Sequence, residues 1–561
     1  MRVFRLMRRF ALLTIAAVVL FVIMPPAPRP LPAAPPGMAA PIRGVIHVHT
    51  NRSDGTGSVD DVTRAAAAAG LQFVIITDHG DGTRTPDLPD YRNGVLYIDG
   101  VEVSTIDGHL VALGLPKAPY PLGGEGRDVV DDVHRLGGIA IAAHPGSPKP
   151  DLQWKDWNAP IDGLEWLSAD SEWRDERPWA FVRTLLTYPF RPPQALALLL
   201  DRPEPVIRRW DELAQRRRIF GVAAADAHAR VGVRSFGEPY DSAGSLHFPS
   251  YANSFREFSI ALPDARLTRD AAADAGAVLN AIRDGAFYSM IDALAGPAAL
   301  RVAANAGSIT VDAQAPDDAQ ITLFRNGVAV ANTQGRRLEH AADAGVYRVE
   351  VTLPSGPGTP PVPWLMSNPV YVDREPEAPA PPRTSTASAR TSSSTDLSGP
   401  RTFHAVYDNG PARGWTIEKS ASSDAALDVV GALPGTQLLL RFAISGSSAD
   451  SPYAAFVMPA TSAIGMYDRL MFMARADRPM RLSVQLRASG GADSRWRRSV
   501  YVDQMPRAIE VPFADFHGIS TSMPEHPDLS QIDSVLFVID SVNTKIGSNG
   551  QIQIDDIKYA K

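Results

Sequence analysis

The sequence predicts an α/β domain followed by two all-β domains. From Ile42 to about Met290, apolar strands alternate with helices, which is typical of a parallel sheet or barrel covered by helices. From about residue 297 the pattern changes to short strands of alternating polarity, and this pattern returns from residue 402 to the end. Between the two all-β parts, residues 373–401 are rich in Pro, Ser, Thr and Ala, and we expect a disordered linker there.

Composition limits the classes of function. The chain has 561 residues, a formal net charge of −7 and no cysteine. The negative charge gives no strong signal for nucleic-acid binding, which needs a basic face. Without cysteine, disulfides, thiol nucleophiles and cysteine-based zinc sites are excluded. Any transition-metal site would have to be made from His, Asp and Glu.

Residues 1–24 have the features of an export signal. Four arginines precede an apolar run from Phe10 to Met24. We expect an uncleaved signal anchor, because prolines follow the small residues that a peptidase would need; a cleaved signal peptide is the alternative. The chain is then exported, and is either membrane-anchored facing the periplasm or exterior, or secreted. Residues 25–42 are Pro/Ala-rich and are expected to form an extended tether.

The α/β domain is expected over residues 43–292. Strands are predicted at 42–50, 71–79, 94–104, 108–115, 139–146 and 218–230. A helix is predicted at 59–70, with Ser58 as its N-cap and Gly70 at its end, and another at 127–138. Residues 151–218 are rich in Trp, Arg and Pro, and we expect a helical insertion there near the mouth of the site.

The two all-β domains are expected at 297–372, as a small β-sandwich, and at 402–561, as a jelly-roll-like sandwich. The second resembles, in layout alone, the jelly-roll modules of extracellular enzymes, which often bind carbohydrate. Trp415 and Trp496 are the residues that would stack on a sugar ring. The alternatives are that both are buried core residues and that the domain is a structural spacer.

The stretch GVIHVHTNRSDG at 44–55 is the first sign of a metal site. In a strand, His47 and His49 point to the same face, and Asp54 follows in the next loop. Polar groups end the other predicted strands in the same way, and the full set is His47, His49, Asp54, Asp78, His79, Glu102, His109, His144, Asp226 and His228.

The number of these groups favours more than one ion. Parallel strands bring their carboxyl ends to one edge, and a mononuclear site uses only three or four protein ligands. Each group alone is more readily explained as a structural residue. Together they favour two or three divalent ions with Glu102 as a bridge, because so many buried charges would otherwise be unpaired.

The motif order HxH…SDG, TDH, GVEVS, HL, AHP, DAH resembles the PHP (polymerase and histidinol phosphatase) family over residues 43–290. The resemblance implies a distorted (β/α)7 barrel with up to three ions of zinc, manganese or iron. It assigns His47, His49, Glu102 and Asp226 to the first ion, Glu102, His109 and His144 to the second, and Asp54, His79 and His228 to the third. Asp78 and Glu102 are the expected catalytic residues, Asp78 by orienting His79 or a bound water.

These assignments predict a metal-dependent phosphoesterase. A water shared between two ions has its pKa lowered toward neutrality, and this hydroxide would attack a phosphate mono- or diester in a small molecule or polymer. Arg230 and Arg174 would bind the phosphate, or are ordinary surface arginines. The alternatives are a metallohydrolase of another ester, amide or carbamate, and a non-catalytic metal-containing binding protein.

Overall fold

The computed structural model describes residues 20–561 except 176–177, 233–244, 247, 306, 355, 375–401, 432–434, 490–493 and 521–522, and before residue 20 it describes only 7, 9, 10, 12, 14 and 18. Nearly all of the predicted linker, and most of the predicted signal segment, therefore lie outside the described residues. The chain divides into two compact units. The N-terminal unit holds residues 1–81, 85–116 and 133–380, and the C-terminal unit holds 82–84, 117–132 and 381–561.

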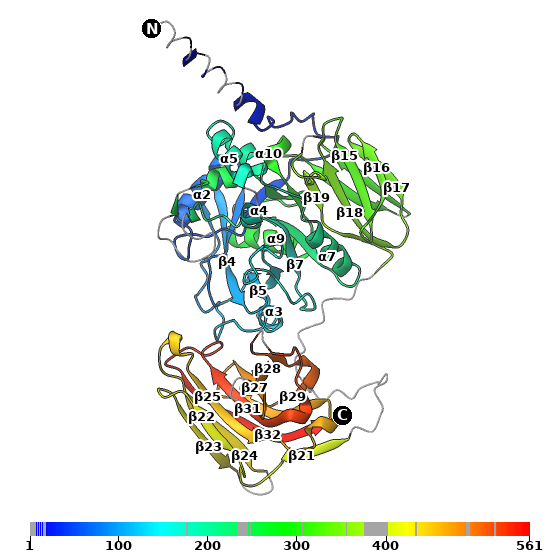
Figure 1. Cartoon of the computed structure of the whole chain (residues 1–561). Helices are drawn as coiled ribbons and strands as arrows, with labels where there is room; N and C mark the ends of the chain where they lie inside the picture. The colour runs from blue at the N-terminus through cyan, green and yellow to red at the C-terminus, as the bar shows by residue number, and fades with distance from the viewer. Residues whose placement is uncertain are drawn as a thin grey trace. The chain divides into compact units, whose positions relative to one another are not determined.

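Seven strands of the N-terminal unit form the predicted α/β sheet (Figure 1). They are β1 (Ile42–Ile46), β2 (Phe73–Ile76), β4 (Val95–Thr105), β5 (Gly108–Leu113), β6 (Ile139–Ala142), β7 (Gly163–Ser168) and β8 (Phe220–Ala224), hydrogen-bonded in this order. The two ends of the row meet, because the amide of Ala225 donates to the carbonyl of Ile46 at 3.0 Å. The sheet is mixed rather than parallel, since β5 runs antiparallel to both neighbours.

Helices alternate with these strands along the chain, and two of them, α2 and α3, begin within one residue of the predicted start. They are α2 (Val59–Ala68), α3 (Gly126–Arg135), α4 (Ala169–Asp175), α5 (Pro178–Thr187), α6 (Pro192–Ala197), α7 (Glu204–Ala214), α8 (Tyr251–Ser254), α9 (Ala271–Arg283) and α10 (Asp292–Ala295). Ser58 caps α2 in a capping box with Asp61, as expected for a helix N-terminus. Apolar strand residues pack against Val278 and Ile282 of α9, which gives this side of the sheet its core.

The expected insertion at 151–218 is not wholly helical. Strand β7 lies inside it and pairs in parallel with both β6 and β8. Helix α7 is the crossover that leads from this region back to β8. The added helical segment is therefore shorter than predicted and consists of α4, α5 and α6. The strand GLEWLS was not predicted, because the segment around it is rich in Trp, Arg and Pro.

The small all-β part is joined to the α/β sheet. Strands β11 (Ser259–Leu262) and β12 (Tyr288–Met290) extend that sheet beyond β1, and β12 pairs with β19 (Leu365–Ser367). The same sheet continues through β18 (Gly345–Thr352), β15 (Gln320–Arg325) and β16 (Val328–Gln334), with β3 (Asp90–Arg92) and β20 (Val370–Val372) as side pairs. Strands β13 (Leu300–Asn305), β14 (Ser308–Ala313) and β17 (Arg337–Ala341) form a separate sheet, and β9 (Val231–Gly232) pairs with β10 (Ser245–Leu246). Residues 297–372 thus share one compact unit with the α/β part rather than standing alone.

The Pro-rich segment after residue 24 is extended, but it is not a free tether. The amide of Arg29 donates to the carbonyl of Leu294 at 2.8 Å, and its guanidinium pairs with Asp318 at 2.5 Å. Gln314 donates to the carbonyl of Pro32 at 2.8 Å. Within the described part of the chain, no helix is both long enough and apolar enough to cross a membrane.

The C-terminal unit is a two-layered β-sandwich (Figure 1). One six-stranded sheet contains β21 (Phe403–Tyr407), β23 (Asp424–Val430), β24 (Gln437–Ala443), β26 (Arg469–Ala476), β29 (Arg507–Pro512) and β32 (Asn549–Ala560). The other contains β22 (Thr416–Lys419), β25 (Tyr453–Pro459), β27 (Met480–Ala488), β28 (Arg495–Val502), β30 (His517–Gly518) and β31 (Ile532–Asp540). Phe472 and Phe537, one from each sheet, meet edge to face in the core.

Trp496 belongs to this core, and Trp415 is partly buried against it. Trp415 lies parallel to Phe537 with ring centroids 5.8 Å apart. Trp496 is 5% exposed, and its indole nitrogen donates to the carbonyl of Pro524 at 2.9 Å. Apolar burial and a satisfied N–H are what a core tryptophan needs, so Trp496 is a core residue, whereas the sugar stacking expected of the partly buried Trp415 stays a prediction.

A buried ion network links α7 to β18. Arg348 and Glu350 are 2% and 3% exposed, and Arg348 makes a two-pronged contact with Asp211 of α7 at 2.9 and 3.0 Å. Arg202 also binds Glu350, at 2.9 Å through Nη2. Burial alone would raise the pKa of Glu350, but Arg348 and Arg202 outweigh it and lower that pKa below its usual range. The network is therefore charged at neutral pH and joins the α/β part to the small β part.

Replacing Glu350→Gln should lower the free energy of unfolding at pH 7 by about 3 kcal/mol, because Arg348 and Arg202 each lose the buried one of their two counter-charges. A group with a lowered pKa stabilises the fold above its unfolded pKa of about 4.3 and stops doing so as the pH falls through its folded value. The difference from the parent should therefore shrink below about pH 4. Urea unfolding across this pH range measures the difference in free energy, with the exposed Glu339→Gln as the matched control. Equal effects of the two substitutions would contradict a charged, buried Glu350.

Candidate metal centre

All the predicted metal ligands gather at one edge of the α/β sheet. His47, His49 and Asp54 follow β1, His79 follows β2, Glu102 lies in β4, His109 in β5, His144 after β6, and Asp226 and His228 after β8. The imidazole rings are close neighbours: the centroids of His49 and His228 lie 4.2 Å apart, and those of His49 and His79 lie 4.6 Å apart. The cluster lies within the N-terminal unit.

The strand directions explain why these side chains meet. β1, β2, β6 and β8 bring their carboxyl ends to this edge, as in other α/β sheets. β5 runs the other way, so His109 reaches the same edge from near the beginning of its strand. β4 extends past the end of β2, and an isolated bridge between His79 and Glu102 continues their parallel pairing.

Glu102 is the centre of the cluster. Its Oε2 lies 3.1 Å from Nε2 of both His47 and His49. Its Oε1 lies 2.7 Å from Nδ1 of His109 and 2.9 Å from Nε2 of His144. The carboxylate is 1% exposed, so nearly all of its surroundings are imidazole and not water.

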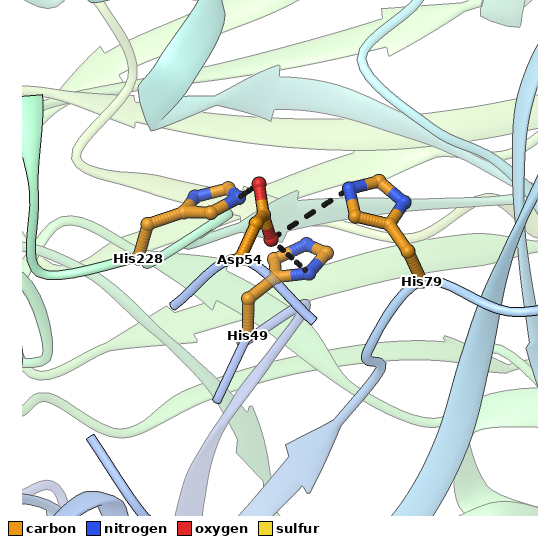
Figure 2. A group of neighbouring side chains, drawn as sticks. All are labelled: His49, Asp54, His79 and His228. Carbon is orange, nitrogen blue, oxygen red and sulfur yellow. Dashed lines mark ion pairs between the residues drawn. The ribbon is translucent and has the colours of Figure 1, made fainter. Parts of the chain in front are cut away.

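Four overlapping groups of side chains have the spacing of metal ligands. Within each group the nitrogen and oxygen atoms lie within 4.8 Å of one another. The groups are His49, Asp54, His79 and His228 (Figure 2); His47, Glu102 and His144; His47, His49 and Asp226; and His79, Glu102 and His109. The first group contains the third expected ligand set with His49 added, and the third group contains the first expected set without Glu102. The second expected set is divided between the other two groups, one of which joins Glu102 and His144 with His47, and the other Glu102 and His109 with His79.

The donor atoms fit divalent ions. The Nε2 atoms of His47 and His49 are buried and make no hydrogen bond of good geometry, although carboxylate oxygens lie 3.1–3.4 Å away. A buried polar atom without a hydrogen bond is costly, and a metal ion removes that cost. Nδ1 of His144 lies 3.1 Å from the carbonyl of Leu152, which assigns the proton to Nδ1 and turns the Nε2 lone pair toward Glu102.

Glu165 is a site residue that the sequence interpretation missed. One oxygen of its carboxylate lies 2.5 Å from Nδ1 of His47, and the other accepts the backbone amide of His144 at 2.7 Å. Glu165 comes from β7, the strand that was not predicted. A carboxylate at the centre of the apolar segment GLEWLS was the available signal. Its position is that of an outer group that fixes the orientation of a metal-ligating histidine.

Asp78 binds the loop between His49 and Asp54, a contact that the sequence did not predict. Its two oxygens accept hydrogen bonds from the amide and hydroxyl of Thr50, at 2.7 and 2.6 Å, and Oδ1 also accepts one from Ser53 at 2.7 Å. Asp78 thus holds the loop that carries Asp54, and its expected catalytic role stays a prediction. The same loop needs Gly55, where a Cβ atom would lie 2.3 Å from the carbonyl oxygen of His49.

The backbone is strained where the ligands are attached. His47, Asp226 and His144 have φ values of 64°, 41° and 29°, a region that non-glycine residues seldom adopt. The left-handed turn at His47 also means that β1 ends at Ile46, so strand alternation alone does not aim the two histidines. Such strain costs on the order of 1–3 kcal/mol per residue and is characteristic of functional sites.

Charges within the cluster shift its pKa values in opposite directions. Burial would lower the pKa of His49, but the contacts with Asp226 and Glu102 outweigh it and raise that pKa to about 10. Burial would raise the pKa of Glu102, but His79, His47 and His109 hold it well below its usual range. Burial, with help from other imidazoles, lowers the pKa of His79 to about 4. The carboxylates therefore stay ionised, and without a metal they draw protons onto the imidazoles.

Two arginines lie beside the cluster. Nη2 of Arg230 lies 3.0 Å from Oδ2 of Asp54. Arg174 of α4 is bound to Asp170, and its pKa is raised: burial would lower it, but Asp170, and also Asp226 and Asp54, outweigh burial. The negative field of the ligand cluster thus reaches both guanidinium groups.

No protein-family model matches the chain. An uncharacterised protein of Methanocaldococcus jannaschii is 28% identical over 139 residues, covering 22% of this chain and 80% of that protein. The family 11 carbohydrate-binding module of a cellulosomal cellulase of Clostridium thermocellum is 16% identical, with a TM-score of 0.24, covering 28% of this chain and 94% of the module. A family 30 module from a Clostridium thermocellum cellulase is 12% identical, with a TM-score of 0.21, covering 28% and 96%. At these scores the likenesses say nothing about a ligand of this chain.

Replacing Glu165→Gln should raise the dissociation constant for zinc or manganese about tenfold to a hundredfold, because His47 loses the carboxylate that orients it. Competition with a chromophoric chelator measures the affinity. Glu212→Gln on α7, an exposed pair with Arg209, serves as the matched control and should leave it unchanged. An unaltered affinity in the Glu165 variant would remove this residue from the metal centre.

Divalent metal should stabilise the N-terminal unit. At a free concentration of about 100 times the dissociation constant, a single ion that binds only the folded state adds about 2.7 kcal/mol to the free energy of unfolding. Thermal unfolding with added manganese, and again after a chelator, measures this. The unfolding of the C-terminal β-sandwich is the internal control and should not move; equal shifts in both, or none, would argue against a metal centre at Glu102.

Proposed function

We propose that the N-terminal unit is a metal-dependent phosphoesterase that hydrolyses a phosphate mono- or diester at a centre of two or three divalent ions. The observation that carries this proposal is the set of four overlapping ligand groups, two of which share Glu102. A single structural ion would need only one such group. Several groups sharing one buried carboxylate are suited to ions that act together on one substrate.

The strand arrangement supports a distorted (β/α)7 barrel of PHP type as the scaffold. Seven strands follow one another in sequence order, and the last returns to the first through hydrogen bonds from Ala225 to Ile46 and from Ala227 to His47. The motif order of the sequence is that of the PHP family, and each of its ligand positions falls at the same edge of this row of strands.

The ligand sets follow from the contacts. His47, His49 and Asp226, with Glu102 at 3.1 Å from both histidines, would hold one ion. Glu102, His109 and His144 would hold a second, and Asp54, His79 and His228, with His49, a third. When bound, such ions supply Lewis-acid activation of water and neutralise charge on a phosphoryl group.

The chain itself contributes orientation and charge around that chemistry. Glu165 fixes the ring of His47, and the loop held by Asp78 fixes Asp54. His79, with its pKa lowered to about 4, stays neutral at physiological pH and keeps a lone pair available. Arg230 and Arg174 supply positive charge beside the cluster, which favours an anionic substrate over a neutral ester or amide.

Purified full-length protein loaded with zinc or manganese should hydrolyse bis-p-nitrophenyl phosphate or p-nitrophenyl phosphate faster than p-nitrophenyl acetate. Glu102→Gln should reduce phosphoester turnover to near background, because the shared ligand of two groups is lost. Release of p-nitrophenol, measured beside elemental analysis of the same sample, tests both points. The exposed Glu339→Gln is the matched control and should keep full activity.

The pattern of substrates distinguishes the rival functions. Cleavage of the acetate alone, with metal bound, would replace the phosphoesterase by a metallohydrolase of another ester, amide or carbamate. Stoichiometric metal without turnover of any of the three would favour a binding protein. Absence of stoichiometric metal in the parent would overturn the proposal at its foundation.

A further inference from the structure

Helix α5 has its polarity inverted. The side chains of Trp179, Leu185 and Leu186 are 63%, 54% and 50% exposed, and Phe190, just beyond the helix, is 59% exposed. The buried side of the helix holds Thr184 and Thr187 instead. A helix that packs on a protein in water buries its apolar face and exposes its polar one. The outward face of α5 is therefore suited to a surrounding that is not water.

The buried threonines show that this orientation is built into the fold. The hydroxyl of Thr184 donates to the carbonyl of Ala195 in α6 at 3.1 Å. The hydroxyl of Thr187 donates to the carbonyl of Arg183 at 2.8 Å. Turning the helix over would break the first of these bonds, so the packing of α5 on α6 holds the apolar face outward.

The N-terminal segment joins the unit beside α5 (Figure 1). Nε of Arg183 in α5 donates to the carbonyl of Ile23 at 2.9 Å, and Nη1 of Arg191 donates to the carbonyl of Pro25 at 2.5 Å. Just before this junction, Phe21 and Val22 are 84% and 72% exposed. The apolar face of α5 and the apolar N-terminal segment, which are far apart in sequence, are thus held next to each other by these two hydrogen bonds.

We propose that α5 lies in the interfacial region of a lipid bilayer, beside the N-terminal segment. Trp and Phe are favoured at this depth, because their rings are apolar and tolerate the polar headgroups. Arginines at the junction can extend toward the headgroups while their stems stay among apolar groups. The apolar N-terminal segment argues for lipid as the occupant, since its exposed side chains need the same surrounding as those of α5.

This location has a consequence for the metal centre. Helix α4, which carries Arg174, directly precedes α5 in the chain. A helix of this length spans about 10 Å. With α5 at the lipid surface, Arg174 lies no farther from α5 along the chain than the length of α4. The metal centre is then held near the bilayer surface and not at the end of a flexible tether.

The experiment uses the full chain, which has no natural cysteine and so takes a single label cleanly. Leu185→Cys on α5 and Leu88→Cys, whose native leucine is 85% exposed in the same unit, are each labelled with the fluorophore NBD. Both proteins are reconstituted into phosphatidylcholine–phosphatidylglycerol vesicles with or without doxyl-labelled lipid. We expect the label at 185 to shift to the blue and to be quenched several-fold more strongly than the label at 88.

The other outcomes would overturn the proposal. A blue shift at 185 that grows with protein concentration, without quenching by doxyl lipid, would assign the face to a second copy of the chain. If the protein floats with the vesicles but the label at 185 is not quenched, the N-terminal segment alone anchors the protein. In a second variant, Trp179→Ser with Leu186→Ser in the Leu185→Cys background, quenching should fall several-fold; unchanged quenching would also count against a role for this face.

Discussion

The carboxylate of Glu102 lies within 3.3 Å of nitrogen atoms from five histidines, and it has almost no access to water. A buried charge of this kind is tolerated only when its surroundings compensate it. Protons on the imidazoles do so when no metal is bound, and divalent ions would do so with the lone pairs turned inward. The remaining features of the site, from the strained backbone to the reversed strand β5, serve to keep this arrangement together.

The supporting residues act on the backbone as much as on the ligands. Glu165 reaches both the ring of His47 and the amide of His144, two residues with positive φ. Asp78 holds the turn that follows His49 through Thr50 and Ser53. These bonds offset the local strain, so the ligand geometry does not depend on an ion to create it. A preformed site of this kind loses little free energy to reorganisation when it binds metal.

Much of the α/β part and of the candidate site could be predicted because their signals are local. The helix that begins at Ser58, and the polar residues that end the apolar strands, depend on neighbours in the chain. Glu165 could not be found in this way, because its strand lies in a segment whose composition favoured helices. The separation of residues 297–372 was also misjudged, since the pairing of β12 with β19 joins residues far apart in sequence. Trp496, one of the two tryptophans considered for sugar stacking, is a core residue, because exposure depends on the packing of both sheets.

The sequence by itself determined which ligand types are available, their order along the chain, and the absence of cysteine from any metal site. Motif spacing was sufficient for this, because each motif places its polar group at the end of an apolar strand. Only the tertiary structure decided that Glu165 orients His47, that Asp78 supports a loop, and that α5 turns its apolar face outward. The reason is that each of these depends on contacts between elements that are distant in the chain. Such contacts are set by strand direction and burial, which residue spacing does not encode.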